Sequence, residues 1–169
     1  MNVRFVNPFV IAAGEVLRSE VHTEIRRGEI KLYRSASTGN DVTTLLSLVG
    51  QVEGVVMYGM SKDMALKLVS KMLGQPVTEL DELAQSGIAE LGNVITGRAS
   101  TLLAGEGYVS NISVPTLIIG SSVEISTLDF QRLVVPLISD YGTMEVHIAL
   151  RERSVNGVGG SAQAAARVM

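Results

Sequence analysis

The sequence of 169 residues contains no cysteine, no excess of basic charge and no long apolar run. Without cysteine there is no disulfide framework, no thiolate nucleophile and no cysteine-based metal site. A formal net charge of −3 and a pI near 5.4 argue against nucleic acid and anionic membranes as partners, because both require clustered Lys and Arg. No segment approaches the roughly 18 uninterrupted apolar residues of a membrane-spanning helix, and the N-terminus lacks an export signal. We therefore expect a soluble, cytoplasmic protein.

Apolar residues make up 46% of the chain, which at this length is enough to bury the core of one domain. The last stretch, 154–169, is rich in Gly, Ala and Ser and has no periodic apolar face. We therefore expect a domain at 1–153 followed by a flexible tail at 154–169.

Apolar periodicity predicts three helices, at 2–18, 61–73 and 80–105. In the first helix we expect Asn7 to be the cap and Pro8 to lie in the first turn. Expected strands are a hairpin within 20–36, an antiparallel pair at 42–49 and 52–58, a strand beginning near Pro115, and a hairpin of 131–139 and 143–152. Residues 37–41 are expected to form a loop.

These elements indicate an α+β fold class: a layered domain with an antiparallel sheet of about six strands and helices packed on one face. The first and the longest helix each precede a set of strands, which hints at two similar halves.

Most catalytic constellations are missing from the sequence. His22 and His147 both fall in strand patterns, and neither has a second ligand at helical or turn spacing, so we expect no metal site. There is no Gly-x-Ser-x-Gly nucleophile elbow, and the glycine run at 157–160 lacks the strand, helix and lysine of a phosphate-binding loop.

The helix expected at 80–105 has an unusual outer face. Four small or polar residues share one stripe on it: Ser86, Glu90, Asn93 and Gly97. Counting about 100° per residue, the four fall within an arc of about 60°, opposite the apolar residues of the same helix. The stripe offers a carboxylate, a carboxamide one turn further on and little bulk around them, so another molecule could approach closely. Thr78 and Asp81 are candidate caps.

A Glu-x-x-Asn spacing is also typical of an ordinary solvated helix face, and that interpretation stays open. Asparagine is a poor helix former, so the place of Asn93 in mid-helix suggests a local reason. Pro115 cannot donate to a strand ladder and so belongs at a strand start or an edge. Its distance from Asn93 along the chain could bring a rigid strand start beside the stripe.

These residues carry a family resemblance. Ser86, Glu90 and Asn93, followed by Pro115, resemble the signature of the CheC, CheX and FliY family of phosphatases, which act on phosphorylated CheY-type response regulators. The likeness extends to the residues around Asn7-Pro8-Phe9 and covers most of 2–152.

Within that family the chain is most similar to the CheX-like members. Some relatives carry a second Glu-and-Asn pair in the first helix, whereas here Glu15 is followed three residues later by Arg18, so only one site is carried over. The resemblance implies a CheC/CheX-like fold and a homodimer formed through sheet edges, for which the long strands expected at 131–152 are physically suited.

The resemblance also implies the reaction: hydrolysis of the phosphoaspartate on a phosphorylated CheY-like receiver domain, in chemotaxis or a related two-component pathway. Asn93 would place the attacking water, and Glu90 would pair with the receiver's active-site lysine. Ser86, Gly97 and Pro115 would be accessory residues. The chain itself would bind no cofactor, since the divalent metal, Mg²⁺, is expected on the receiver.

Two other classes of function stay open. A binding module without catalysis would use the same face to dock onto a receiver or to join a flagellar switch. A ligand-binding α+β domain would require a pocket, which a sequence does not display.

Overall fold

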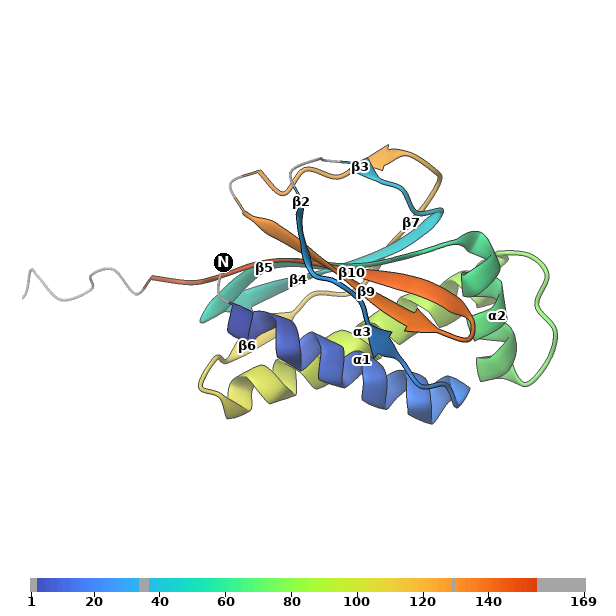
Figure 1. Cartoon of the computed structure of the whole chain (residues 1–169), viewed down its shortest axis with the longest axis horizontal. Helices are drawn as coiled ribbons and strands as arrows, with labels where there is room; N and C mark the ends of the chain where they lie inside the picture. The colour runs from blue at the N-terminus through green and yellow to red at the C-terminus, as the bar shows by residue number, and fades with distance from the viewer. Residues whose placement is uncertain (1–2, 34–36, 129, 155–169) are drawn as a thin grey trace, which may run out of the picture.

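The computed structural model describes residues 3–33, 37–128 and 130–154. Two helices lie side by side across one face of an antiparallel sheet (Figure 1). They are α1 (Val6–Val21), preceded by the short 3-10 turn η1 (Val3–Phe5), and α3 (Glu82–Gly105), which runs in the opposite direction. The third helix, α2 (Lys62–Leu73), stands at one end of the sheet. Residues 155–169 of the predicted tail lie outside the described residues.

The main sheet contains eight strands, all paired antiparallel, in the order β1-β9-β10-β5-β4-β6, with β2 also on β9 and β7 also on β4. Their bounds are β1 Arg26–Arg27, β2 Lys31–Tyr33, β4 Val42–Gly50, β5 Val52–Met60, β6 Ser110–Ile112, β7 Thr116–Ile119, β9 Arg132–Ser139 and β10 Gly142–Glu152. A second sheet pairs β3 (Ser37–Thr38) with β8 (Val123–Glu124), so part of the loop expected at 37–41 is a strand. The α+β class is confirmed, and the strand count exceeds six because each sheet edge is split into two short strands.

Both predicted long hairpins are confirmed. β4 and β5 pair through a turn at Gly50 and Gln51, and Gly50 has a φ of 157°, which L side chains rarely adopt. β9 and β10 pair from Ser139 and Gly142 outward. Alternate residues of β10 belong to the core and are at most 2% exposed: Met144, Val146, Ile148 and Leu150.

The predicted hairpin within 20–36 is wrong. α1 continues to Val21, and His22 caps its C-terminus in a left-handed conformation instead of lying in a strand. β1 and β2 then both pair with β9 and not with each other. The Gly28 amide between them donates to the Pro136 carbonyl at 2.8 Å. Because Pro136 has no N–H to donate in return, the ladder is interrupted there and the edge is broken into two strands.

Two further expectations are corrected. Phe5, not Asn7, is the N-cap residue of α1, and its side chain makes no capping hydrogen bond. Pro8 lies in the first turn, where its missing N–H costs little because first-turn amides have no intrahelical partner. The long strands β9 and β10, expected to offer pairing edges, lie inside the sheet between β1 and β5.

The topology confirms the hint of two halves. The hairpin β4–β5 and the hairpin β9–β10 meet at the centre of the sheet, where β5 pairs with β10. The short strands that follow α1 pair with β9, and those that follow α3 pair with β4. α1 is therefore the internal counterpart of α3, and α2 stands between the halves in sequence.

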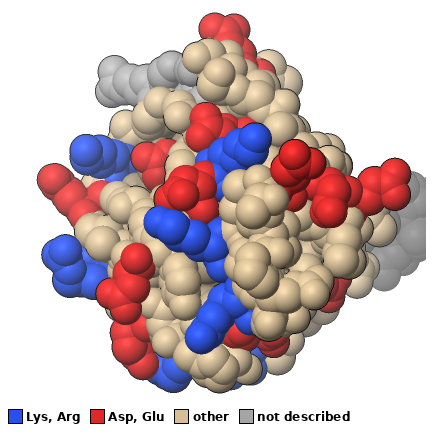
Figure 2. All heavy atoms as spheres, turned by 90° about the vertical axis from the view of Figure 1, so that its right-hand side faces the viewer, with Lys and Arg blue, Asp and Glu red and all other residues tan. Residues whose placement is uncertain are grey.

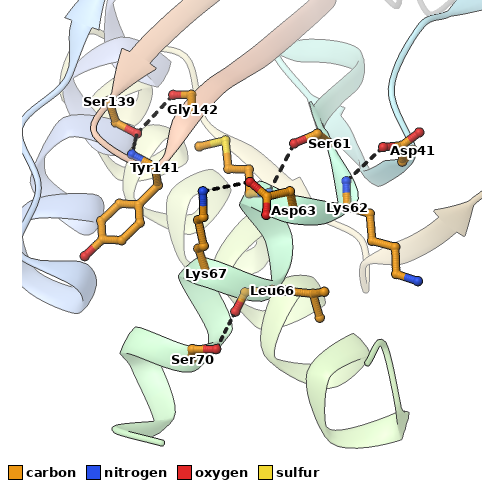
Figure 3. A network of polar contacts seen from close by, with 11 residues as sticks. Asp41, Ser61, Lys62, Asp63, Leu66, Lys67, Ser70, Ser139, Tyr141 and Gly142 are labelled. Carbon is orange, nitrogen blue, oxygen red and sulfur yellow. Dashed lines mark hydrogen bonds and ion pairs between the residues drawn. The ribbon is translucent and has the colours of Figure 1, made fainter. Parts of the chain in front are cut away.

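α2 forms as predicted from its end signals. The Ser61 hydroxyl accepts from the Met64 amide at 3.1 Å, and Gly74 ends the helix in a left-handed conformation. Figure 3 shows how the start of α2 is tied to β4, because the Asp41 carboxylate accepts from the Lys62 amide at 2.9 Å. This connection fixes one end of the sheet against α2.

The β3–β8 pair lies on the side of the sheet away from the helices (Figure 1). His147, expected to be partly exposed, is only 1% exposed. Its Nε2 lies 3.3 Å from the Glu145 carboxylate, to which the Asn40 amide also donates at 2.8 Å. The Tyr33 ring packs edge-on against the imidazole at 5.9 Å.

Candidate functional site

The candidate site lies on α3, and the ends of this helix are fixed by its own sequence. The Asp81 carboxylate accepts from the Ala84 amide at 2.8 Å, so Asp81 rather than Thr78 is the cap. The helix ends at Gly105, and Gly107 follows with a φ of 93°. A carboxylate at the N-cap also interacts favourably with the helix dipole.

The inner face of α3 anchors it to the sheet. Its buried residues are Ala84, Ile88, Leu91, Gly92, Ile95, Thr96, Ala99 and Leu103. Full burial of each large apolar side chain contributes about 1.5–3 kcal/mol, so the helix is held firmly on this side. The predicted apolar face is confirmed, and near its C-terminal end Leu103 is buried while Leu102 is only half-buried.

The predicted stripe lies on the outer face of α3. Ser86 and Glu90 are exposed, while Asn93 and Gly97 are half-buried. Within the part of the chain that the structure describes, no hydrogen bond or ion pair engages the side chains of Ser86, Glu90 or Asn93. A carboxylate and a carboxamide one turn apart are therefore available to a second molecule.

One border of the stripe is the broken edge formed by β6 and β7, which both pack against α3. Pro115 is half-buried and immediately precedes β7, as expected of a strand start. The Ser113 hydroxyl accepts from the Ser47 amide at 2.9 Å and fixes the break. A Cβ added to Gly97 would lie 3.9 Å from the Ile112 Cδ1, so the stripe is open at this position.

The other border is α1. The Arg98 guanidinium donates to the Glu15 carboxylate at 2.6 and 3.3 Å, and this hydrogen bond holds the pKa of Glu15 below its ordinary value. Arg18 is paired with Glu24 at 2.7 Å. Glu15 and Arg18 of α1 are thus engaged within the protein, whereas Glu90 of the α3 stripe is not.

Two features of the site were missed by sequence reasoning. Beneath the stripe, Gly92 and Thr96 contact the sheet through Thr44 and Tyr58. A mid-helix glycine costs about 1 kcal/mol relative to alanine, so Gly92 was the sequence feature that could have predicted a close contact of the helix here. Beside the stripe, Leu83 and Val94 are 56% and 39% exposed and add apolar surface to this side of the helix.

A second concave surface lies away from the stripe. It is an open groove of about 930 Å³ beside α2, lined among others by His22, Lys67, Lys71 and Tyr141. Lys67 is paired with Asp63 at 2.7 Å. Figure 2 shows that basic and acidic side chains are interspersed on this end of the molecule, so no patch of one sign marks a charged ligand. The α3 stripe remains the candidate site.

The described residues 3–33, 37–128 and 130–154 hold no group of three or more His, Cys, Asp or Glu that could bind a metal ion. Among the same residues, no helix is both long and apolar enough to cross a membrane.

Comparison with known proteins identifies similar chains. The family described as chemotaxis phosphatase CheX matches residues 42–137. The CheY-P phosphatase CheX of Thermotoga maritima is 31% identical over 128 residues, which are 75% of this chain and 83% of that protein.

Solved structures of CheC-like and CheX proteins are also similar to this chain. A CheC-like superfamily protein from Shewanella sp. PV-4 superimposes with a TM-score of 0.82 and 31% identity, over 89% of this chain and 99% of that one. A chain of the CheX–CheY–BeF3–Mg²⁺ complex from Borrelia burgdorferi superimposes with a TM-score of 0.76 and 30% identity, over 89% of this chain and 100% of that one.

Proposed function

The chain belongs to the CheX family of chemotaxis phosphatases, and from this we propose that it hydrolyses the phosphoaspartate of a CheY-type receiver domain in the cytoplasm. The pathway would be chemotaxis or a related two-component system. The observation that carries the proposal is the pair Glu90 and Asn93, which lie one turn apart on a firmly anchored helix with unengaged side chains. The relative from Borrelia burgdorferi forms a complex with CheY, which supports a receiver as the partner.

Asn93 suits the placement of a water molecule. Its carboxamide has an acceptor and two donors, so it can orient water for in-line attack on phosphorus, as a glutamine does in GTPases. The half-buried position of Asn93 restricts its side-chain rotamers, and less entropy is then lost when the water is positioned.

Glu90 would fix the two proteins in register by pairing with the receiver's active-site lysine. A charge-assisted hydrogen bond is worth about 1.5–3 kcal/mol, which corresponds to a loss of roughly 10- to 150-fold when the carboxylate is removed. Mg²⁺ would belong to the receiver, where it neutralises the phosphoryl oxygens.

The surroundings of the pair are open enough for docking. Ser86 and Gly97 add little bulk, and Leu83 and Val94 would contribute apolar contact beside the polar groups. Pro115 would keep the neighbouring strand edge rigid, because its φ is fixed.

The test is the rate of phosphate loss from a phosphorylated receiver of the same cell. We expect Asn93→Ala to lower the rate roughly 10²- to 10³-fold, the cost of removing one positioned polar group. Glu90→Ala should weaken association instead. Asn111→Ala and Glu106→Ala, at exposed positions outside the stripe, are the matched controls. An unchanged rate for Asn93→Ala would remove the proposed mechanism.

The alternative is a docking module without catalysis. It uses the same face, so Glu90→Ala would again weaken binding. The lifetime of the receiver phosphate would then be the same with and without the wild-type protein.

We also propose a homodimer, as the family resemblance implies. The available sheet edges are the split ones, β1 with β2 and β6 with β7, which are short and so offer limited pairing. Sedimentation equilibrium measures the mass directly, and a single species of 18.0 kDa at all concentrations would exclude the dimer.

A further inference from the structure

At Gly92, α3 lies close against the sheet. It lies over Thr44 of β4 and Tyr58 of β5, which are direct partners across the ladder. A Cβ at this position would lie 2.7 Å from the Thr44 Cγ2 and 3.3 Å from the Tyr58 Cδ2. A side chain at 92 would therefore force Thr44 or α3 to shift. Because the Thr44 Cβ would also lie only 3.2 Å away, rotation of the Thr44 side chain alone would not relieve the contact.

A chain of buried hydroxyl groups holds the same point of the helix. The Thr96 hydroxyl donates to the Gly92 carbonyl at 2.7 Å, and the Tyr58 hydroxyl lies 2.8 Å from the Thr96 Oγ1. Since the single hydrogen of Thr96 goes to Gly92, Tyr58 is the donor to Thr96. Tyr58 and Thr96 are 1% and 0% exposed, and burial raises the pKa of Tyr58. The phenol therefore keeps the proton that it donates to Thr96.

The hydrogen bonds from Tyr58 through Thr96 end at the Gly92 carbonyl, which belongs to the peptide group between Gly92 and Asn93. The Gly92 carbonyl and the Asn93 amide belong to one rigid plane, so a fixed carbonyl fixes the point from which the Asn93 side chain leaves the helix. A side-chain atom about 6 Å from the helix axis moves about 1 Å when the helix rotates by about 10°. A misplacement of that size can cost about 10² in rate.

We propose that Gly92, Thr96 and Tyr58 are positioning residues that set the depth and rotation of α3, and thereby the place of the Asn93 carboxamide. The inference rests on the proposed function of Asn93. None of the three residues would touch the receiver, since all lie on the inner side of the helix or within the sheet.

The strongest variant is Gly92→Ala. The contact of 2.7 Å must open to an ordinary separation of about 3.5–4.0 Å, a displacement of about 1 Å, so we expect kcat to fall about 10²-fold. Thr44→Ser removes the Cγ2 that makes this contact. The double variant Gly92→Ala with Thr44→Ser should therefore recover a large part of kcat.

Tyr58→Phe is the milder variant and keeps the ring in place. We expect kcat for receiver dephosphorylation to fall roughly 3- to 10-fold with KM unchanged, because a shift smaller than about 1 Å costs less than 10². Val135→Ala, in β9, is the control: it removes a buried apolar group two strands away from Tyr58. It should lower thermal stability while leaving kcat unchanged.

A second readout does not depend on activity. The side-chain amide NMR signals of Asn93 should shift or broaden in Tyr58→Phe and stay in place in Val135→Ala. Wild-type kcat values in Tyr58→Phe and Gly92→Ala, or unmoved Asn93 signals, would overturn the positioning role. If wild type and Asn93→Ala dephosphorylate the receiver equally, the proposed role of Asn93 fails instead, and the NMR comparison still tests the positioning.

Discussion

Filling the open stripe at Gly97 should separate stability from activity. This residue lies on the outer face one turn beyond Asn93, in the interior of α3, and an added Cβ has only ordinary contact with Ile112 at 3.9 Å. Side chains of a helix lean toward its N-terminus, so a leucine at 97 would extend over Asn93. It would thus stand where the receiver has to enter.

Substitution at Gly97 should raise stability and lower activity. Replacing a compatible helical glycine by alanine stabilises a protein by about 0.4–1 kcal/mol, which raises Tm by roughly 1–4 °C at this chain length. We expect this gain for Gly97→Ala, and Gly97→Leu should be at least as stable as wild type because it adds contact with Ile112. Gly97→Leu should nevertheless lower kcat/KM for receiver dephosphorylation roughly 5- to 150-fold, because overpacking typically costs about 1–3 kcal/mol.

Calorimetry and phosphate release on the same preparations measure both quantities. Thr101→Leu is the control, since Thr101 is exposed on the same side of α3, about 6 Å beyond Gly97 and about 12 Å beyond Asn93 along the helix. A stable Gly97→Leu protein with wild-type kcat/KM would refute the reasoning that the receiver covers this stripe.

Two further predictions concern the surroundings of the site and the far face of the sheet. Leu83→Ser should raise KM roughly 3- to 10-fold with kcat unchanged, because Leu83 is 56% exposed beside the stripe and truncation of an apolar contact costs about 1 kcal/mol. Val109→Ser is the control. Val109 is 59% exposed beyond the end of the helix, so this variant should leave both KM and kcat unchanged. The hydrogen bonds from His147 and Asn40 to the Glu145 carboxylate hold the pKa of Glu145 below its ordinary value of 4.5. These bonds therefore stabilise the fold fully above pH 4.5, and their contribution is lost as the pH falls through the lowered pKa. Asn40→Ala should therefore lower Tm at about pH 7 and have progressively less effect toward about pH 2, and an equal loss at both pH values would contradict this assignment.

Local signals in the sequence predicted much of the fold. The caps of α2 at Ser61 and Gly74, the cap of α3 at Asp81, and the alternation in β10 all act between residues close in the chain. Such signals depend on a few neighbouring residues, and this is why they can be read before the structure is known.

Long-range partners could not be predicted in the same way. The alternation Val21, Thr23, Ile25 resembled a strand, yet α1 continues to Val21 and ends at a left-handed His22. The strands that follow pair with β9, more than 100 residues further along the chain. No local pattern in 20–36 distinguishes that partner from a neighbouring strand.

In the candidate site, too, local features could be predicted from the sequence and long-range contacts could not. The helical period brought Glu90 and Asn93 onto one exposed face, and the structure places them there with unengaged side chains. The support beneath them is the contact of Gly92 with Thr44 and the bond of Thr96 to Tyr58. These contacts join α3 to strands far away in the chain, so sequence periodicity shows only the helix face and not its partner.

The central claim is that Asn93 acts on the chemical step itself. The most direct measurement is single-turnover phosphate release from the phosphorylated receiver with this protein in saturating excess, so that binding no longer limits the rate. The account predicts that wild type shortens the lifetime of the receiver phosphate and that Asn93→Ala, although bound, is slower by roughly 10²- to 10³-fold. Equal single-turnover rates for the two proteins would contradict it.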